Sequence, residues 1–179
     1  MSFFRLALLL VLQAVVVTAW AVDSLTETQI KAAYLSKFAA YVEWPASAFA
    51  EVDTPLTIGV MGAEDIAKEL HFITKERTVN DRVVQVKSLE LGDSLTGVQI
   101  LYVGQQDEVR LKRLLESLQS MPILTITASP VRYAGSVINF IPVANHIRFE
   151  VSATQAEQKN LKISARLLSV AQKIETGSQ

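Results

Sequence analysis

The chain has 179 residues and no cysteine, 50% of its residues are hydrophobic, and its formal net charge at pH 7 is −1. The hydrophobic fraction excludes disorder for most of the chain. The near-neutral charge gives no general attraction to nucleic acid or to an anionic membrane. Without cysteine, disulfides, thiolate catalysis and sulfur-based zinc sites are excluded, and we expect no metal site.

The N-terminal segment has the parts of a secretory signal peptide. Residues 1–5 carry one positive charge, residues 6–17 are apolar except for Gln13, and Ala19-Trp20-Ala21 has the small-x-small pattern of a cleavage site. The apolar run is shorter than the roughly 20 residues that cross a bilayer. We predict cleavage after Ala21, secretion into a Gram-negative periplasm, and no membrane insertion afterwards. Residues 22–179 then form a single domain.

Hydrophobic periodicity predicts alternating helices and strands in the first two thirds of the mature chain. A helix is expected over residues 26–42, after a capping box in Ser24-Leu25-Thr26-Glu27. The elements expected next are strands at 56–61, 83–86, 99–103 and 123–128, and helices at 64–73 and after the N-cap Asp107. This alternation favours a three-layer α/β sandwich with a mostly parallel central sheet.

The C-terminal part has a different pattern. Residues 136–141 and 147–151 predict an antiparallel hairpin, because apolar residues in the second strand alternate with Arg148 and Glu150. Ser152 then predicts the start of a long C-terminal helix, whose apolar stripe would bury residues as far as 174. A gap in that stripe near Asn160 indicates a bend or a break.

We find no residues that would assemble into a catalytic centre. Gly59-Val60-Met61-Gly62 lacks the three glycines of a dinucleotide site, and Glu64 and Asp65 would repel phosphate from the following helix. A serine nucleophile needs a histidine base, but no serine lies in a Gly-x-Ser-x-Gly turn, and the histidines are only His71 and His146. We therefore expect a binding protein without a cofactor, not an enzyme.

Five residues are candidates for contacting a partner or a ligand. Tyr41 and Trp44 close the first helix with an aromatic cluster, which either packs in the core or forms an interface edge. Asn139 interrupts an apolar run and either satisfies a backbone group or lines a pocket. His146 and Arg148 lie in the hairpin, where Arg148 is either a solvated charge or a contact for an anion or an acidic partner.

Several segments, taken together and in order, resemble the YfiR-like family. The resemblance lies in residues 30–38, 44–45 and 56–60, and more strongly in residues 138–140, 147–151 and 161–168. It implies a periplasmic repressor, acting as a dimer, that binds the periplasmic sensor domain of a membrane-bound diguanylate cyclase. Such binding would keep cyclic di-GMP low and restrain biofilm formation. Redox control is not implied, because this chain has no cysteine.

A periplasmic receptor for a small molecule is the alternative. Ligands of open parallel sheets bind at the carboxyl ends of the strands, which predicts a pocket near Gly62, Gly104 and Ser129. A regulator that binds another protein predicts instead an exposed apolar patch beside polar residues. The two roles are compatible if a ligand controls the regulator.

Overall fold

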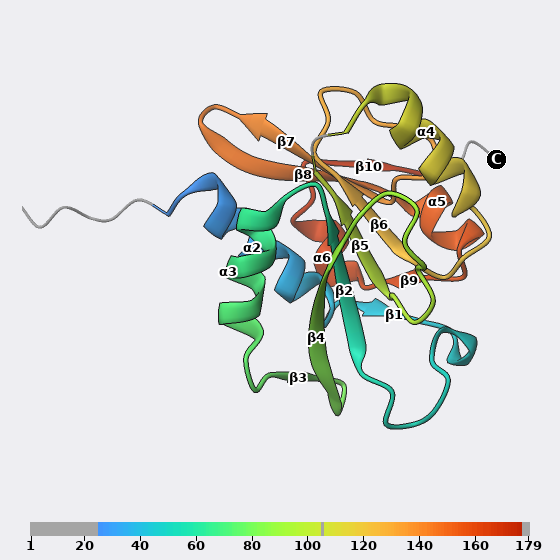
Figure 1. Ribbon diagram of the computed structural model, residues 1–179. Helices are drawn as coiled ribbons and strands as arrows, with labels where there is room; N and C mark the ends of the chain where they lie inside the picture. Colours follow the sequence, from blue (N-terminus) through green and yellow to red (C-terminus); the bar gives the residue numbers. More distant parts are fainter. Residues whose placement is uncertain (1–24, 105, 177–179) are drawn as a thin grey trace, which may run out of the picture.

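The computed structural model describes residues 25–104 and 106–176, so the predicted signal peptide lies outside the described residues. Its main sheet consists of β2 (Leu56–Met61), β3 (Thr78–Val79), β4 (Arg82–Leu89), β5 (Ile100–Val103), β6 (Leu124–Thr127), β7 (Ile138–Val143), β8 (His146–Ser152) and β10 (Lys173–Glu175). The strand order is β10-β8-β7-β6-β5-β2-β4-β3 (Figure 1). Strands β4, β2, β5, β6 and β7 are parallel, whereas β8 is antiparallel to β7.

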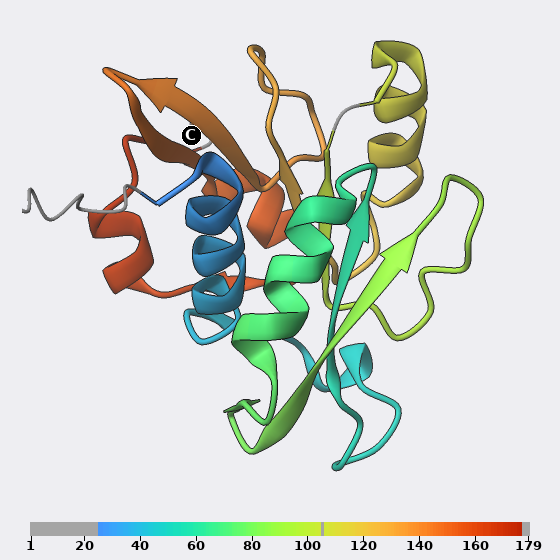
Figure 2. The same cartoon turned by 60° about the vertical axis from the view of Figure 1, so that its left-hand side comes forward.

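Helices cover both faces of this sheet. On one side lie α2 (Glu27–Phe38), α3 (Glu64–Thr74) and α6 (Ala165–Ser169), and on the other lie α4 (Glu108–Ser117) and α5 (Ala153–Gln158) (Figures 1 and 2). A 3-10 helix, η1 (Ala46–Ala48), follows a second small sheet, in which β1 (Val42–Glu43) pairs antiparallel with β9 (Lys162–Ile163). The predicted three-layer sandwich with a mostly parallel sheet is confirmed.

The core is divided between the two faces of the sheet. Ile100 and Tyr102 of β5 pack in the larger cluster beneath α2 and α3. Leu101 and Val103, which alternate with them, pack in a second cluster with Leu115 of α4. Because neighbouring strand residues point to opposite faces, β5 is covered on both sides and is apolar at every position.

The first helix begins one step later than predicted. Thr26 is its N-cap, and Gln29 closes the capping box, with Gln29 N–H donating to Thr26 Oγ1 (3.2 Å) and Thr26 N–H donating to Gln29 Oε1 (2.9 Å). Glu27, which was predicted to close a box with Ser24, is instead the first helical residue. Both frames have a hydroxyl followed three residues later by a box partner, and the structure uses the second frame.

The same helix also ends earlier than predicted, at Phe38 instead of Val42. After a tight turn, Val42 pairs with Ile163 and Glu43 pairs with Lys162 in the small sheet. The apolar spacing continues through Val42 because this residue is buried, but it is buried as part of a strand. Periodicity alone could not distinguish the two conformations over so short a segment.

The prediction of one long C-terminal helix is wrong. The segment instead contains two short helices and two short strands, in the order α5, β9, α6 and β10. Asn160 has a φ of 55°, and this left-handed conformation ends the helix where the apolar stripe has its gap. Ser164 then caps α6, its Oγ accepting a hydrogen bond from Leu167 N–H (3.2 Å). Val170 and Ile174, which were predicted to be buried, are 62% and 42% exposed.

The predicted antiparallel hairpin of β7 and β8 is confirmed, but its first strand is Ile138–Val143 instead of residues 136–141. Its turn is only Ala144 and Asn145, with φ values of 45° and 63°, instead of a connection of about five residues. Asn80 and Asp81, with φ values of 50° and 63°, connect β3 to β4. Two successive residues with positive φ are typical of the tight turns that fit the twist of a β-hairpin.

Candidate functional site

A groove of about 460 Å³ lies between α2, β8 and α6. Its buried lining residues are Phe38, Phe149 and Leu167, each at most 3% exposed. Tyr34 and Tyr41 are half-buried and also line it. The groove therefore has an aromatic and aliphatic base that could receive an apolar group.

Aromatic packing between α2 and β8 holds this base in place. The ring centroids of Phe38 and Phe149 are 5.1 Å apart with the planes at 73°, and those of Tyr34 and Phe149 are 5.4 Å apart at 70°. Edge-to-face pairs of this kind are favourable beyond the area they bury. Tyr34 and Phe38 are four residues apart and so lie on the same face of α2.

Three basic side chains surround the base of the groove. Lys37 comes from α2, Arg148 from β8 and Arg166 from α6, and all three are exposed. No acidic residue is among the described residues that line the groove. This concentration of positive charge, in a chain whose net charge is −1, favours an occupant with a negative group. We call this site the basic groove.

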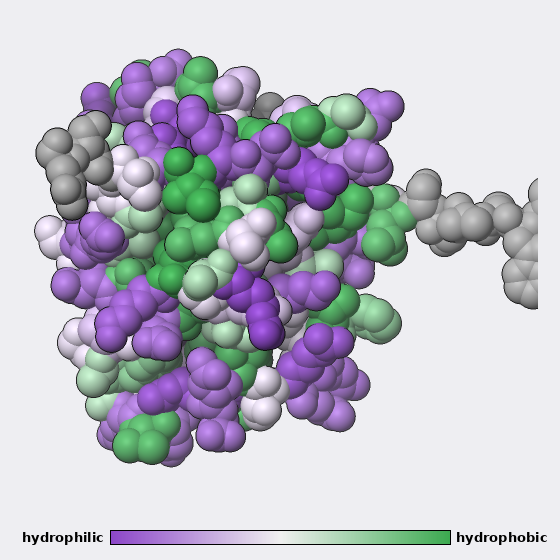
Figure 3. Space-filling view, turned by 180° about the vertical axis from the view of Figure 1, so that it is seen from behind, coloured by the Kyte–Doolittle hydropathy of each residue, from purple (hydrophilic) through white to green (hydrophobic). Residues whose placement is uncertain are grey.

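Exposed apolar residues continue the surface beyond the basic groove. Val170 lies at its margin, and Ile174 lies on β10, the last strand of the sheet. Figure 3 shows the side of the molecule opposite to that of Figure 1. An apolar area lies there over α6 and β10, surrounded by hydrophilic side chains. An apolar patch of this kind beside polar residues is a feature of interaction surfaces.

The structure brings two of the five predicted binding residues together. Tyr41 and Arg148 both line the basic groove, although about a hundred residues separate them in the sequence. The carbonyl of Tyr41 accepts a hydrogen bond from Ser164 N–H (2.9 Å), which ties the turn after α2 to the start of α6. His146 is exposed at the first position of β8, at the hairpin turn, and does not line the groove.

Trp44 lies outside the basic groove. Its Nε1 donates a hydrogen bond to the carbonyl of Gln99 (3.1 Å), and its ring packs against the larger core cluster. The Nε2 of Gln99 in turn donates to the carbonyl of Ala48 (2.7 Å). Trp44 also lines a separate hollow of about 470 Å³ with Asn160 and Lys162. The two hydrogen bonds with Gln99 connect the segment after β1 to the residue just before β5.

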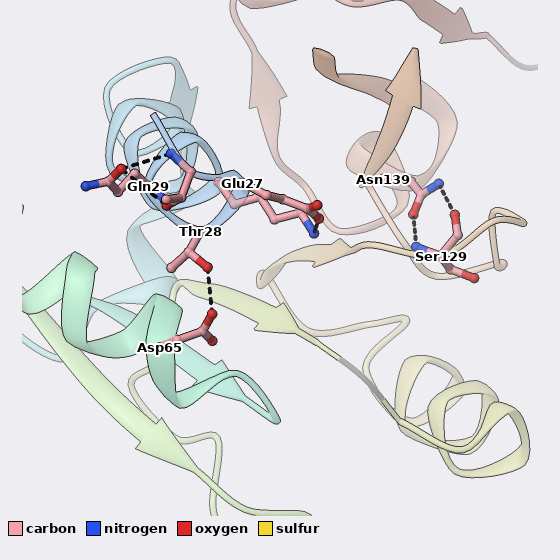
Figure 4. Close-up of polar contacts among 8 residues, drawn as sticks. Glu27, Thr28, Gln29, Asp65, Ser129 and Asn139 are labelled. Carbon is pink, nitrogen blue, oxygen red and sulfur yellow. Dashed lines mark hydrogen bonds and ion pairs between the residues drawn. The ribbon is translucent and has the colours of Figure 1, made fainter. Parts of the chain in front are cut away.

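Asn139 is 1% exposed and belongs to a polar network on the α4 side of the sheet. Its Nδ2 donates to the carbonyl of Ser129 (3.0 Å), and its Oδ1 accepts from Ser129 N–H (3.0 Å) (Figure 4). The same Oδ1 also accepts from Thr127 Oγ1 (2.8 Å). Of the two roles that the sequence left open, the amide performs the first, because it satisfies backbone groups of the β6–β7 connection.

The carboxyl ends of β2 and β5 approach each other closely. A Cβ atom on Gly104 would lie 2.5 Å from the carbonyl oxygen of Gly62, so the two connections are in direct backbone contact. The region where one pocket was predicted contains two hollows, one of about 310 Å³ at these glycines and one of about 250 Å³ at Ser129. Glu27 and Lys31, which form an ion pair, line both hollows.

A hydrogen bond beside these hollows joins α2 to α3. Thr28 Oγ1 donates to Asp65 Oδ2 (2.6 Å), as Figure 4 shows. This bond is the main reason why the pKa of the Asp65 carboxyl lies below its ordinary value. The carboxylate stays ionised at the N-terminus of α3, which agrees with the expectation that this helix start would repel phosphate.

Sequence reasoning missed Lys37 and Arg166. Lys37 could have been found, because it lies three residues after Tyr34 and four before Tyr41, on the same helical face. The position of Arg166 could not be predicted in this way. The sequence placed it on a long C-terminal helix, whereas it lies on the separate short helix α6. We see no feature of the linear sequence that would have placed it beside Arg148.

Among residues 25–104 and 106–176, no helix combines the length and apolar character needed to cross a membrane. The same residues contain no cluster of three histidine or carboxylate side chains that could hold a metal ion.

One family model, described as YfiR/HmsC-like, matches residues 28–172 of the chain. This range contains every residue of the basic groove and all the segments on which the resemblance rested. No curated protein matches the sequence.

Proposed function

Since the chain belongs to the YfiR/HmsC-like family, we propose that it is an exported regulatory protein that represses a membrane-bound diguanylate cyclase. The repressor binds the periplasmic sensor domain of the cyclase and holds it in an inactive state. Cellular cyclic di-GMP then stays low, and biofilm formation is restrained. The protein acts by reversible association and is not an enzyme.

The single observation that supports this proposal most is the exposed apolar surface beside the basic groove. Val170, which directly follows α6, and Ile174, on the edge strand β10, are 62% and 42% exposed. Exposed apolar side chains of this kind gain stability when a partner covers them, at about 25 cal/mol per Å². The charges of Arg148 and Arg166 give the association its orientation. The candidate contact residues are therefore Tyr41 and Arg148 together with these apolar side chains.

The route of export is part of the same proposal. Residues 1–21 direct the chain to the periplasm and are removed after Ala21, so that residues 22–179 meet the sensor domain on its own side of the inner membrane. The experiment is a measurement of cellular cyclic di-GMP in a strain lacking the protein. Complementation uses the full chain and a version without residues 2–21.

We expect cyclic di-GMP to rise on deletion and only the exported version to lower it again. The full chain carrying Arg148→Ala should restore repression only in part, whereas a matched exposed change on α4, Arg113→Ala, should restore it fully. An unchanged level in the deletion strain, while the membrane cyclase is expressed, would mean that the protein does not regulate a cyclase.

A second candidate function is reception of a small molecule, which the volume of the basic groove favours. Ligand pockets are commonly about 300–1,000 Å³ and mostly apolar, with a few polar groups, and the basic groove has about 460 Å³. The ligand would be an aromatic or aliphatic anion. Thermal denaturation with and without aromatic carboxylates tests this role, because a ligand at 100 times its Kd stabilises by about 2.7 kcal/mol. No shift with any such anion would dismiss it.

We further propose that the protein is a homodimer. The outer edge of β10, the last strand of the main sheet and exposed at all three of its residues, is one surface with which a second copy could pair. Light scattering of the mature protein at several concentrations measures the oligomeric state. A monomer at all concentrations would exclude the dimer without affecting the repressor proposal.

A further inference from the structure

We infer that the basic groove receives an acidic, apolar segment of the partner protein, in which aspartate or glutamate residues flank apolar side chains. This inference rests on the proposed function and specifies the chemistry of its contact. Its main support is that the apolar base of the groove is surrounded by side chains of one charge sign only. We call these three side chains, Lys37, Arg148 and Arg166, the rim of the groove.

The base and the rim have different tasks. Phe38, Phe149 and Leu167 are already packed and present a fixed apolar surface, so a docking side chain does not have to order them first. Lys37, Arg148 and Arg166 are exposed and come from three different elements. Carboxylates of one partner segment could therefore meet positive charge on several sides of the groove.

The basic side chains of the rim have no polar partner among the described residues of the protein. None of the three basic side chains forms an ion pair or a hydrogen bond with the described residues. In contrast, Arg132, outside the groove, is paired with Glu175, and Lys31 is paired with Glu27. Basic side chains without an internal acidic partner are available for an external one.

A basic segment would be disfavoured at this site. Burying a partner lysine against three like charges, with no acidic residue among the described lining residues, leaves that charge uncompensated. The same three basic side chains therefore repel basic segments and attract acidic ones. The association rate should consequently fall as salt screens these charges.

The first test uses the isolated periplasmic domain of the membrane-bound cyclase whose deletion abolishes the rise of cyclic di-GMP in the strain lacking the protein. We compare the wild-type protein with Arg148→Glu, Arg166→Glu and the control Arg113→Glu, which makes the same charge change on exposed α4. We expect the Kd to rise by about tenfold or more for each groove variant and to stay constant for the control. Replacing the contacting carboxylate of the partner with lysine should restore binding to a groove variant.

The second test does not need the cyclase. Two synthetic peptides share one pattern of leucine and phenylalanine, with glutamate flanks in one and lysine flanks in the other. The wild type and Arg113→Glu should bind only the glutamate peptide, and Arg166→Glu should lose it. Circular dichroism and the melting temperature of each variant show whether it is folded.

The two tests separate the two proposals. If the glutamate peptide binds as expected while the cyclase domain does not bind at all, the proposed function fails and the inference stands. If the cyclase domain binds but groove variants keep the wild-type Kd, the inference is overturned and the repressor function stands. Equal binding of both peptides, or of neither, also overturns it.

Discussion

Lys159 Nζ donates a hydrogen bond to the carbonyl oxygen of Leu118, and both residues are buried. This contact joins the end of α5 to the end of α4 on one face of the sheet. Burial disfavours the charged form of the lysine and lowers its pKa to about 8.

This lowered pKa predicts how stability depends on pH. Below pH 8 the lysine is protonated in both states, so the unfavourable burial of its charge is fully present. Between pH 8 and the unfolded pKa of about 10.4, the unfolded state binds more protons. Stability contributed by this residue therefore rises with pH, by on the order of 2 kcal/mol between pH 8 and 9.5.

Urea unfolding of the wild type and of Lys159→Met at both pH values checks this prediction. The difference between the two proteins isolates Lys159, because other titrating groups are common to both. Parallel changes of unfolding free energy with pH in the two proteins would contradict it.

Replacing Asn139 with alanine should destabilise the protein strongly. The change removes three hydrogen bonds and leaves the part-buried N–H and carbonyl of Ser129 without their side-chain partner, whereas Thr127 Oγ1 keeps its contact with Ser136 Oγ. Each unsatisfied buried group costs about 1–3 kcal/mol, so we expect the melting temperature to fall by about 5–10 °C. Gln85→Ala, on the exposed surface of β4, is the control, and an equal effect of the two changes would refute this role of Asn139.

Two glycine substitutions should differ in their effect. In Gly104→Ala the new Cβ meets the backbone of Gly62 at 2.5 Å, so the connections after β2 and β5 must separate. In Gly59→Ala the Cβ meets Leu89 Cδ1, also at 2.5 Å, but that atom is the end of a side chain that can rotate. We expect Gly104→Ala to lose about 2 kcal/mol more unfolding free energy than Gly59→Ala, as overpacking costs about 1–3 kcal/mol. Calorimetry of both variants measures this, and the reverse order would disprove it.

The break after α5 depends on the conformation of Asn160. Its φ of 55° is unfavourable for a residue with a Cβ and no local hydrogen-bonding side chain. Asn160→Ala should therefore destabilise the protein by about 1 kcal/mol, whereas Asn160→Gly should not. Chemical denaturation distinguishes them, and a more stable alanine variant would indicate that this segment prefers a continuous helix.

Sequence reasoning succeeded where an element was long enough to show a period. The helix that ends at Thr74 and the strand Leu56–Met61 were predicted to within one residue. It failed for the strand Val42–Glu43 and its partner Lys162–Ile163, because two residues carry no period and their pairing partners lie far apart in sequence. The prediction of a long C-terminal helix failed for a related reason, since the helical spacing of apolar residues from Ile163 to Ile174 runs across β9, α6 and β10.

The candidate site was predicted only in part. Tyr41 and Arg148 were selected for their chemistry, and the structure places both at one groove. Their common location could not be inferred, because it depends on how α2 and α6 pack on β8. Arg166 became part of the rim only through the short helix capped by Ser164.

The contact between Phe38 and Phe149 also constrains how the chain can fold. The two rings join segments about 110 residues apart, and contacts of such long range form slowly because a large loop must close first. Until β7 and β8 have left the ribosome or the export channel, the apolar face of α2 lacks its aromatic partners Phe140 and Phe149. Nascent or truncated chains that end before these strands should therefore be unable to reach the native state and should depend on chaperones.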